Sequence, residues 1–178
     1  MHEREKLNEA KYFLRHMEAS INSPDAFQYE LSAFLSAARS VLQYALEESK
    51  QKPNGQRWYE TQVSGSTILK FFKDKRDINI HTKPVGLSRL ISVSDTLHVS
   101  ISESARIEIT REDGIKEIRE SKEEPRKTNP IESSAEVKIC YILPDWDGPE
   151  DAIQLSRQYL TALEAFVNAG TAFGLISG

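Results

Sequence analysis

A long stripe of apolar residues at positions 23–50 constrains the fold of this chain more than any other sequence feature. The apolar positions recur every three or four residues, the spacing that places side chains on one face of an α-helix. Ser23 suits the N-cap, Pro24 suits the first turn, and Pro53 with Asn54-Gly55 ends the pattern. At 1.5 Å per residue this helix would be about 40 Å long. Its apolar face needs other helices to cover it, which predicts a helical bundle. The stripe consists of Phe27, Leu31, Phe34, Leu35, Ala38, Val41, Leu42 and Ala45.

Three further segments show helical spacing. A first helix is expected over 3–21, and a third helical segment over 56–81, with Gly65 as a kink or a break. A last helix follows "PDWDGPED", where Asp147 suits the N-cap and Glu150 its third-position partner. The apolar stripe of the first helix comprises Leu7, Ala10, Leu14, Met17 and Ile21, and that of the last comprises Ile153, Leu160, Leu163 and Val167.

Between the third and last helical segments the hydrophobic period changes from about 3.6 to 2. "LHVSISES" alternates, "ARIEITREDGIKEIRE" alternates on both sides of Asp113-Gly114, and "AEVKICYIL" alternates again. Asp-Gly between alternating segments is a strong hairpin signal. The segment 120–134 is charged and contains proline, so we expect a mobile loop there. These patterns predict one small antiparallel sheet of three to four strands from Leu90 to Leu143.

The expected fold class is therefore α+β and mainly α: an antiparallel helical bundle with a small antiparallel β-sheet inserted before its last helix. The chain of 178 residues fits a single domain, 1–178. Its bundle would comprise 1–85 and 148–170, and its β insertion 88–143.

Composition excludes several classes of protein. No apolar run approaches 18 residues, and the first residues lack the apolar segment of a signal peptide, so we expect neither a membrane span nor export. A single cysteine excludes an internal disulfide, and no paired Cys/His spacing suggests a metal site or a cofactor. We therefore expect a cytoplasmic protein. The net charge of −4 argues against coating a long nucleic acid.

Charge is nevertheless uneven along the chain. Positions 70–89 carry six basic residues against Asp74 and Asp77, in a chain that is negative overall. A solvated helix face is one interpretation, and a phosphate site is the other. Within this basic cluster, Arg76 and His81 lie five positions apart near the end of an apolar helix. The basic residues are Lys70, Lys73, Lys75, Arg76, Lys83 and Arg89.

The segment "ILKFFKDKRDINIH", which follows a long amphipathic helix, resembles the motif of the HEPN (higher eukaryotes and prokaryotes nucleotide-binding) domains. That family consists of helical bundles, often dimeric, and many members are RNases that carry an Arg, four to six residues and a His. Arg76 and His81 match with four intervening residues, and polar Asp77 follows the arginine. Some members carry a Tyr two residues after the His, linked to a nucleotidyltransferase partner. This chain has Lys83 there, which departs from that pattern.

The resemblance implies a metal-independent endoribonuclease of the toxin or defence type, without a cofactor. Its catalytic residues would be Arg76, Asp77 and His81, and its phosphate-binding residues would be Lys73, Lys75 and Lys83. Histidine can move a proton near neutral pH, and arginine can stabilise charge on phosphoryl oxygens.

On one ideal helix Arg76 and His81 are about 140° apart around the axis. Either the helix frays before His81, or two copies of the motif meet across a dimer axis. An apolar face also suggests a homodimer, and it is formed by Ile68, Leu69, Phe71 and Phe72. RNA or a nucleotide and an antitoxin or nucleotidyltransferase are the other possible partners. The alternative function is a non-catalytic binding or assembly module in which the pair only holds a helix end.

Overall fold

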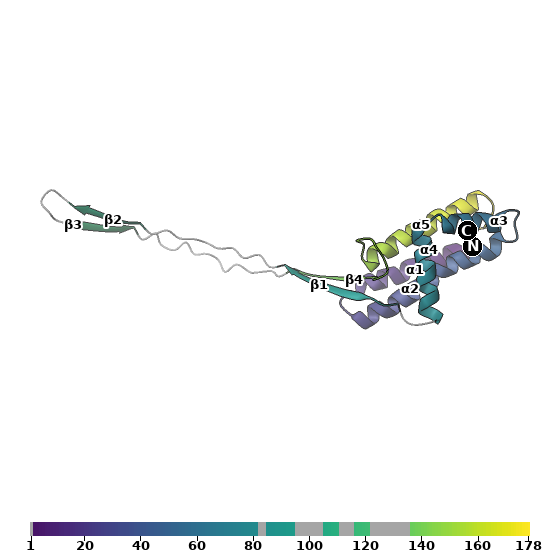
Figure 1. The fold of residues 1–178 in the computed structure, drawn as a ribbon, viewed down its shortest axis with the longest axis horizontal. Coiled ribbons are helices and arrows are strands. Elements are labelled where there is room, and N and C mark those ends of the chain that lie inside the picture. The colour runs from purple at the N-terminus through teal and green to yellow at the C-terminus, as the bar shows by residue number, and fades with distance from the viewer. Residues whose placement is uncertain (1, 82–84, 95–104, 111–115, 122–135) are drawn as a thin grey trace. The chain divides into compact units, whose positions relative to one another are not determined.

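The computed structural model describes residues 2–81, 85–94, 105–110, 116–121 and 136–178 (Figure 1). Within these ranges the protein is mainly helical, with short strands between the fourth and fifth helices, so the expected α+β class is confirmed at this level. The helices are α1 (His2–Ala19), α2 (Pro24–Ser49), α3 (Gly55–Ser64), α4 (Thr67–His81) and α5 (Ala152–Ala172). The strands are β1 (Ser88–Ser94), β2 (Ala105–Thr110), β3 (Lys116–Ser121) and β4 (Glu136–Ile142).

The chain divides into two compact units. The first comprises residues 1–91 and 139–178 and holds the helices, and the second comprises residues 92–138. Inside the first unit α1 and α2 form the most extensive helix pair, and α5 packs against α1, α2 and α4.

The predicted apolar stripes form the core of the helical unit. Every member of the α2 stripe is buried, and so are the α1 stripe residues up to Met17. Ile21 is the exception, because α1 ends at Ala19 and Ile21 lies half-buried in the following turn. Burial of such side chains contributes about 1.5–3 kcal/mol each, which makes these stripes the main source of stability.

An aromatic cluster joins α2, α4 and α5 at the centre of the core. The ring of Phe72 stacks on Tyr159 with centroids 4.4 Å apart, and Phe34 meets both rings edge-on. Aromatic pairs in these geometries add about 0.5–1.5 kcal/mol beyond area burial. The cluster therefore fixes α4 against the two long helices.

The third helical segment is split where the sequence indicated a kink or a break. α3 ends at Ser64, Gly65 is its C-cap, and α4 starts at Thr67. A second break lies at Asn54, which has a left-handed φ of 61° ahead of α3. A side chain at Gly55 would place its Cβ 2.0 Å from the Ser49 carbonyl oxygen, so this close approach requires glycine.

Among the described residues the strands form two pairs, in place of the single sheet of three to four strands expected from the sequence. β1 pairs with β4, and β2 pairs with β3. The β2–β3 pair is antiparallel, from Ala105 opposite Ser121 to Thr110 opposite Lys116, which confirms the predicted hairpin strands. The sequence pattern did not single out β1. The "LHVSISES" segment, the Asp113-Gly114 turn and most of the 120–134 loop lie outside the described residues.

The N-cap of the last helix is Asp151 and its third-position partner is Gln154, so the expectation of Asp147 and Glu150 in these two roles was wrong. The Asp151 carboxylate accepts from the Gln154 backbone at 2.8 Å, and the Gln154 side chain accepts from the Asp151 backbone at 3.0 Å. This capping box satisfies backbone N–H groups at the helix start, which a carboxylate four residues earlier does not reach.

The C-terminal tail folds back over the end of α5. Gly174 has a left-handed φ of 66° and donates to the Thr171 carbonyl, while Leu175 donates to the Gly170 carbonyl at 2.9 Å. These two bonds form a Schellman motif, which satisfies the last carbonyl groups of the helix. The turn directs Ile176 into the core, where it is 3% exposed.

Candidate functional site

α4 carries most of the residues that the sequence nominated. Ser66 precedes the helix, and its hydroxyl accepts from the Leu69 backbone at 3.4 Å. Leu69 and Phe72 are buried in the core, and Ile68 and Phe71 pack against it. The apolar face that suggested a dimer is therefore covered by the chain itself, and it no longer supports a homodimer.

The backbone of α4 is helical through Arg76 and Asp77 to His81. The side chains of 76–81 lie outside the described residues, so the structure does not test whether these three groups converge. The helical backbone does determine the angle between positions 76 and 81 around the helix axis. Since α4 extends as far as His81, positions 76 and 81 belong to one helix and lie about 140° apart around its axis.

The side chain of Lys75, one of the expected phosphate ligands, is only 8% exposed. Its ammonium group forms an ion pair with Asp145, and it lies 5.3 Å from the centre of the Phe71 ring. Both interactions hold the charge inside the chain. Lys73 is half-buried, and Lys83 lies outside the described residues.

In the fold, carboxylates from another segment lie beside the basic cluster, so the net charge around it is less positive than the sequence of positions 70–89 indicates. Residues 145–148 run beside the first half of α4 and bring Asp145 and Asp147 to a cavity that Lys70 also lines. These carboxylates come from a segment about 70 positions further along the chain, so the charge balance of positions 70–89 alone does not include them.

This cavity, the α4 pocket, has a volume of about 300 Å³. It is lined by Thr67, Lys70, Phe71, Asp74, Asp145, Trp146, Asp147 and Gly148. The rings of Phe71 and Trp146 meet at 66° with centroids 4.9 Å apart, and the Trp146 Nε1–H donates to the Glu150 carboxylate at 2.8 Å. Nothing local in the sequence links Trp146 to Phe71, so this contact depends on the tertiary structure.

The hydrogen bond from Trp146 lowers the pKa of Glu150, so this carboxyl stays ionised to lower pH than an ordinary glutamate. Gly148 makes the bond possible. A Cβ at this position would lie 2.3 Å from the Glu150 Oε2 and 2.4 Å from the Trp146 Nε1. The α4 pocket therefore has a fixed aromatic wall.

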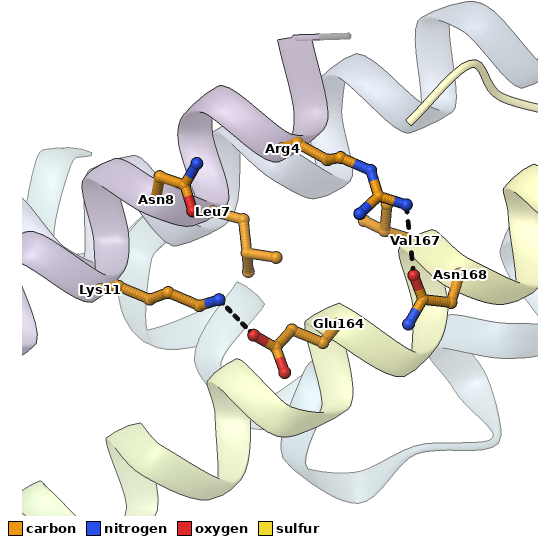
Figure 2. A pocket seen from close by; sticks show the side chains of 7 residues that line it. All are labelled: Arg4, Leu7, Asn8, Lys11, Glu164, Val167 and Asn168. Carbon is orange, nitrogen blue, oxygen red and sulfur yellow. Dashed lines mark hydrogen bonds and ion pairs between the residues drawn. The ribbon is translucent and has the colours of Figure 1, made fainter.

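A second cavity of about 180 Å³ lies between α1 and α5 (Figure 2). Its charged groups already have partners: Lys11 pairs with Glu164, and the Arg4 Nη2–H donates to the Asn168 Oδ1 at 3.4 Å. Polar groups that already have partners within the chain offer little to a ligand, so this cavity is a weaker candidate than the α4 pocket.

Among the residues that the structure describes, no group of three His, Cys, Asp or Glu side chains is arranged to hold a metal ion. Within the same residues, no helix combines the length and apolar character needed to cross a membrane. No family model matches the sequence, and no curated protein or solved structure gives a significant match.

Proposed function

We propose that this protein is a HEPN-like, metal-independent endoribonuclease of the cytosol that acts as a homodimer. The observation that carries the proposal is that α4, anchored in the core by Leu69 and Phe72, stays helical through the Arg76–His81 motif. Five positions on one helix separate the two residues by about 140°, so one copy does not present both to the same phosphate. Two copies would supply one residue each.

In the proposed reaction, His81 removes the proton of a ribose 2′-hydroxyl. The 2′-oxygen then attacks the neighbouring phosphorus, and the bond from phosphorus to the 5′-oxygen breaks. The leaving oxygen takes a proton from water and the His81 imidazolium returns its proton to the solvent, which yields a 2′,3′-cyclic phosphate and a 5′-hydroxyl. The Arg76 guanidinium stabilises the charge that develops on the phosphoryl oxygens, and Asp77 orients His81.

Lys73 and Lys83 would hold the flanking phosphates of the RNA. The structure argues against the same role for Lys75, whose ammonium is buried and paired with Asp145. Binding a phosphate there would first require breaking an ion pair.

Substitution of the motif tests the proposal. Arg76→Ala should lower RNA cleavage by about 10²- to 10³-fold, and His81→Ala by about 10²- to 10⁴-fold. Helical circular dichroism should not change in either variant. Arg57→Ala and His2→Ala are matched controls, because both side chains are exposed on other helices, and both variants should cleave like the wild type.

Mixing the two inactive variants tests the composite site. If Arg76 and His81 come from different copies, a mixed dimer of Arg76→Ala and His81→Ala contains one intact site, so cleavage should partly return. No recovery in verified mixed dimers, or a strict monomer at tens of micromolar, would exclude the composite arrangement.

Two conditions complete the test. Cleavage should survive excess EDTA, and it should fall as the pH drops below about 6.5, because the base becomes protonated. A wild type that cleaves no RNA under any of these conditions would contradict the nuclease function.

The second candidate is a non-catalytic binding module. The observation that favours it is the matching of Lys75 by Asp145, which removes one expected phosphate ligand. A stable wild type that binds RNA without cleaving it, and whose binding weakens in Lys73→Ala, would identify this function.

A further inference from the structure

The α4 pocket contains unmatched negative charge beside aromatic rings. Its lining includes three carboxylates, of which Asp145 is paired with Lys75. Within the described part of the chain, Asp74 and Asp147 form neither a hydrogen bond nor an ion pair through their side chains. Both side chains are exposed, and Lys70 is the only basic residue in the lining that opposes their negative charge. The pocket therefore favours a cation.

The aromatic wall adds a second attraction for the same charge. The π face of an aromatic ring attracts a cation, and tryptophan does so most strongly. This chain already shows the interaction, because the Lys75 ammonium lies 5.3 Å from the centre of the Phe71 ring. Trp146 is half-buried and is held by its bond to Glu150, so its ring is positioned before any ligand arrives.

We propose that the α4 pocket binds an arginine side chain of a partner protein. The cavity of about 300 Å³ can hold a side chain of this size. A planar guanidinium can stack on the Trp146 ring while its N–H groups reach a carboxylate such as Asp74 or Asp147. A lysine ammonium lacks the planar face, so arginine fits this combination of groups better than lysine does.

This inference does not depend on nuclease activity, because the pocket uses none of Arg76, Asp77 and His81. The two sites share α4, however, so a partner bound at the pocket would lie on the helix that carries the motif.

The experiment is an NMR titration of the full chain with N-acetyl-arginine amide. The protein has two tryptophans, Trp58 and Trp146, so the indole N–H signals are assigned with one Trp58→Phe sample. We expect a saturable shift of the Trp146 indole signal with a Kd on the order of 1 mM, and no shift for Trp58. N-acetyl-lysine amide should bind more weakly, and N-acetyl-glutamate amide should not bind.

Two kinds of variant locate the binding. Asp74→Asn and Asp147→Asn should each weaken binding by about two- to fivefold, whereas Asp25→Asn on α2 makes the same change of charge away from the pocket and should have no effect. Gly148→Ala keeps every charge but displaces Trp146 or Glu150, and it should also weaken binding. Amide spectra and thermal unfolding establish that each variant is folded.

The outcomes separate the alternatives. Absence of a saturable shift, equal binding of the glutamate probe, or unchanged affinity in both aspartate variants would overturn the proposal. A free arginine amino acid that binds much more tightly than a capped Gly-Arg-Gly peptide would identify a small-molecule ligand and would overturn the assignment to a partner protein. Comparable or tighter binding of the peptide would support it.

Discussion

Lys75 on α4 forms an ion pair with Asp145, which lies 70 positions further along the chain. The pair is asymmetric: the Lys75 side chain is 8% exposed and the Asp145 side chain 63% exposed. A charge that is buried without its partner is costly, whereas an exposed carboxylate that loses its partner is simply hydrated. Substitution of Asp145 and substitution of Lys75 should therefore change the free energy of unfolding by different amounts.

We expect Asp145→Ala to lower the free energy of unfolding by about 1–3 kcal/mol, because it leaves the buried ammonium of Lys75 unpaired. Lys75→Met should change it by less than about 1 kcal/mol, since Asp145 stays in contact with water. Urea denaturation of the two variants measures both values. Equal losses, or a larger loss in Lys75→Met, would show that the ammonium is not effectively buried.

Gly170 on α5 should not tolerate a methyl group. A Cβ there would lie 2.6 Å from the Trp58 Cη2 and 2.8 Å from the Ile176 Cδ1. Alanine usually stabilises a helix relative to glycine by up to about 1 kcal/mol, but overpacking costs about 1–3 kcal/mol. We therefore expect Gly170→Ala to be destabilising overall, with a changed Trp58 fluorescence.

The matched control for this prediction is Gly86→Ala, because a Cβ at Gly86 would meet no atom within 4 Å. Its thermal midpoint should stay close to that of the wild type. A rise in the midpoint of Gly170→Ala would mean that the tail around Ile176 moves aside without cost.

The two long helices α2 and α5 should respond differently to loss of their N-cap side chains. Asp151→Ala removes a capping-box carboxylate and should lower the free energy of unfolding by about 0.5–2 kcal/mol. Ser23→Ala should have almost no effect, because the Ser23 side chain makes no cap hydrogen bond. Chemical denaturation of both variants gives the comparison, and an equal effect would contradict the difference between these caps.

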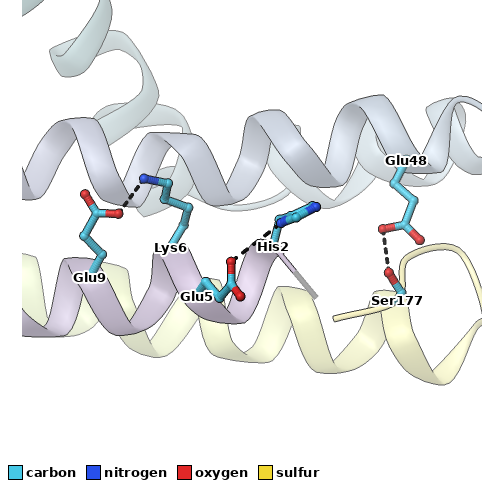
Figure 3. A network of polar contacts seen from close by, with 6 residues as sticks. All are labelled: His2, Glu5, Lys6, Glu9, Glu48 and Ser177. Atoms are coloured by element: carbon cyan, nitrogen blue, oxygen red, sulfur yellow. Dashed lines mark hydrogen bonds and ion pairs between the residues drawn. The ribbon is translucent and has the colours of Figure 1, made fainter.

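Glu48 on α2 and Ser177 in the tail form a hydrogen bond of 3.0 Å that should depend on pH (Figure 3). Burial raises the pKa of Glu48, but hydrogen bonds from the backbone and hydroxyl of Ser177 lower it, and with the smaller contributions of other groups the pKa lies below the ordinary value of a glutamate. A group whose pKa is lowered by folding stabilises the folded state above its unfolded pKa. That contribution is lost as the pH falls through the folded pKa.

Ser177→Ala should therefore lower the free energy of unfolding at pH 7 by up to about 1 kcal/mol, with a smaller loss below pH 4.5. Denaturation curves between pH 7 and pH 3 for wild type and variant provide the measurement. A difference that is constant across this range would show that the Glu48 charge is not involved.

The sequence alone determined the helical core of this protein. Periodic apolar positions such as Phe34 on α2 and Leu163 on α5 are buried, because the period of a helix places them on one face whatever the packing partner is. Residues that interrupt a helix were also predictable from the local sequence, since Gly65 separates α3 from α4. The antiparallel pairing of β2 with β3 also followed from local alternation around one turn.

Only the tertiary structure decided which distant residues meet. The pairing of β1 with β4, the ion pair of Lys75 with Asp145 and the contact of Phe71 with Trp146 each join segments far apart in the chain. Periodicity reports which face of an element is apolar, but not which charged or aromatic side chain of another segment will lie against it. For this reason the sequence indicated a basic phosphate site on α4, whereas the fold places a pocket with an excess of carboxylates beside the same helix.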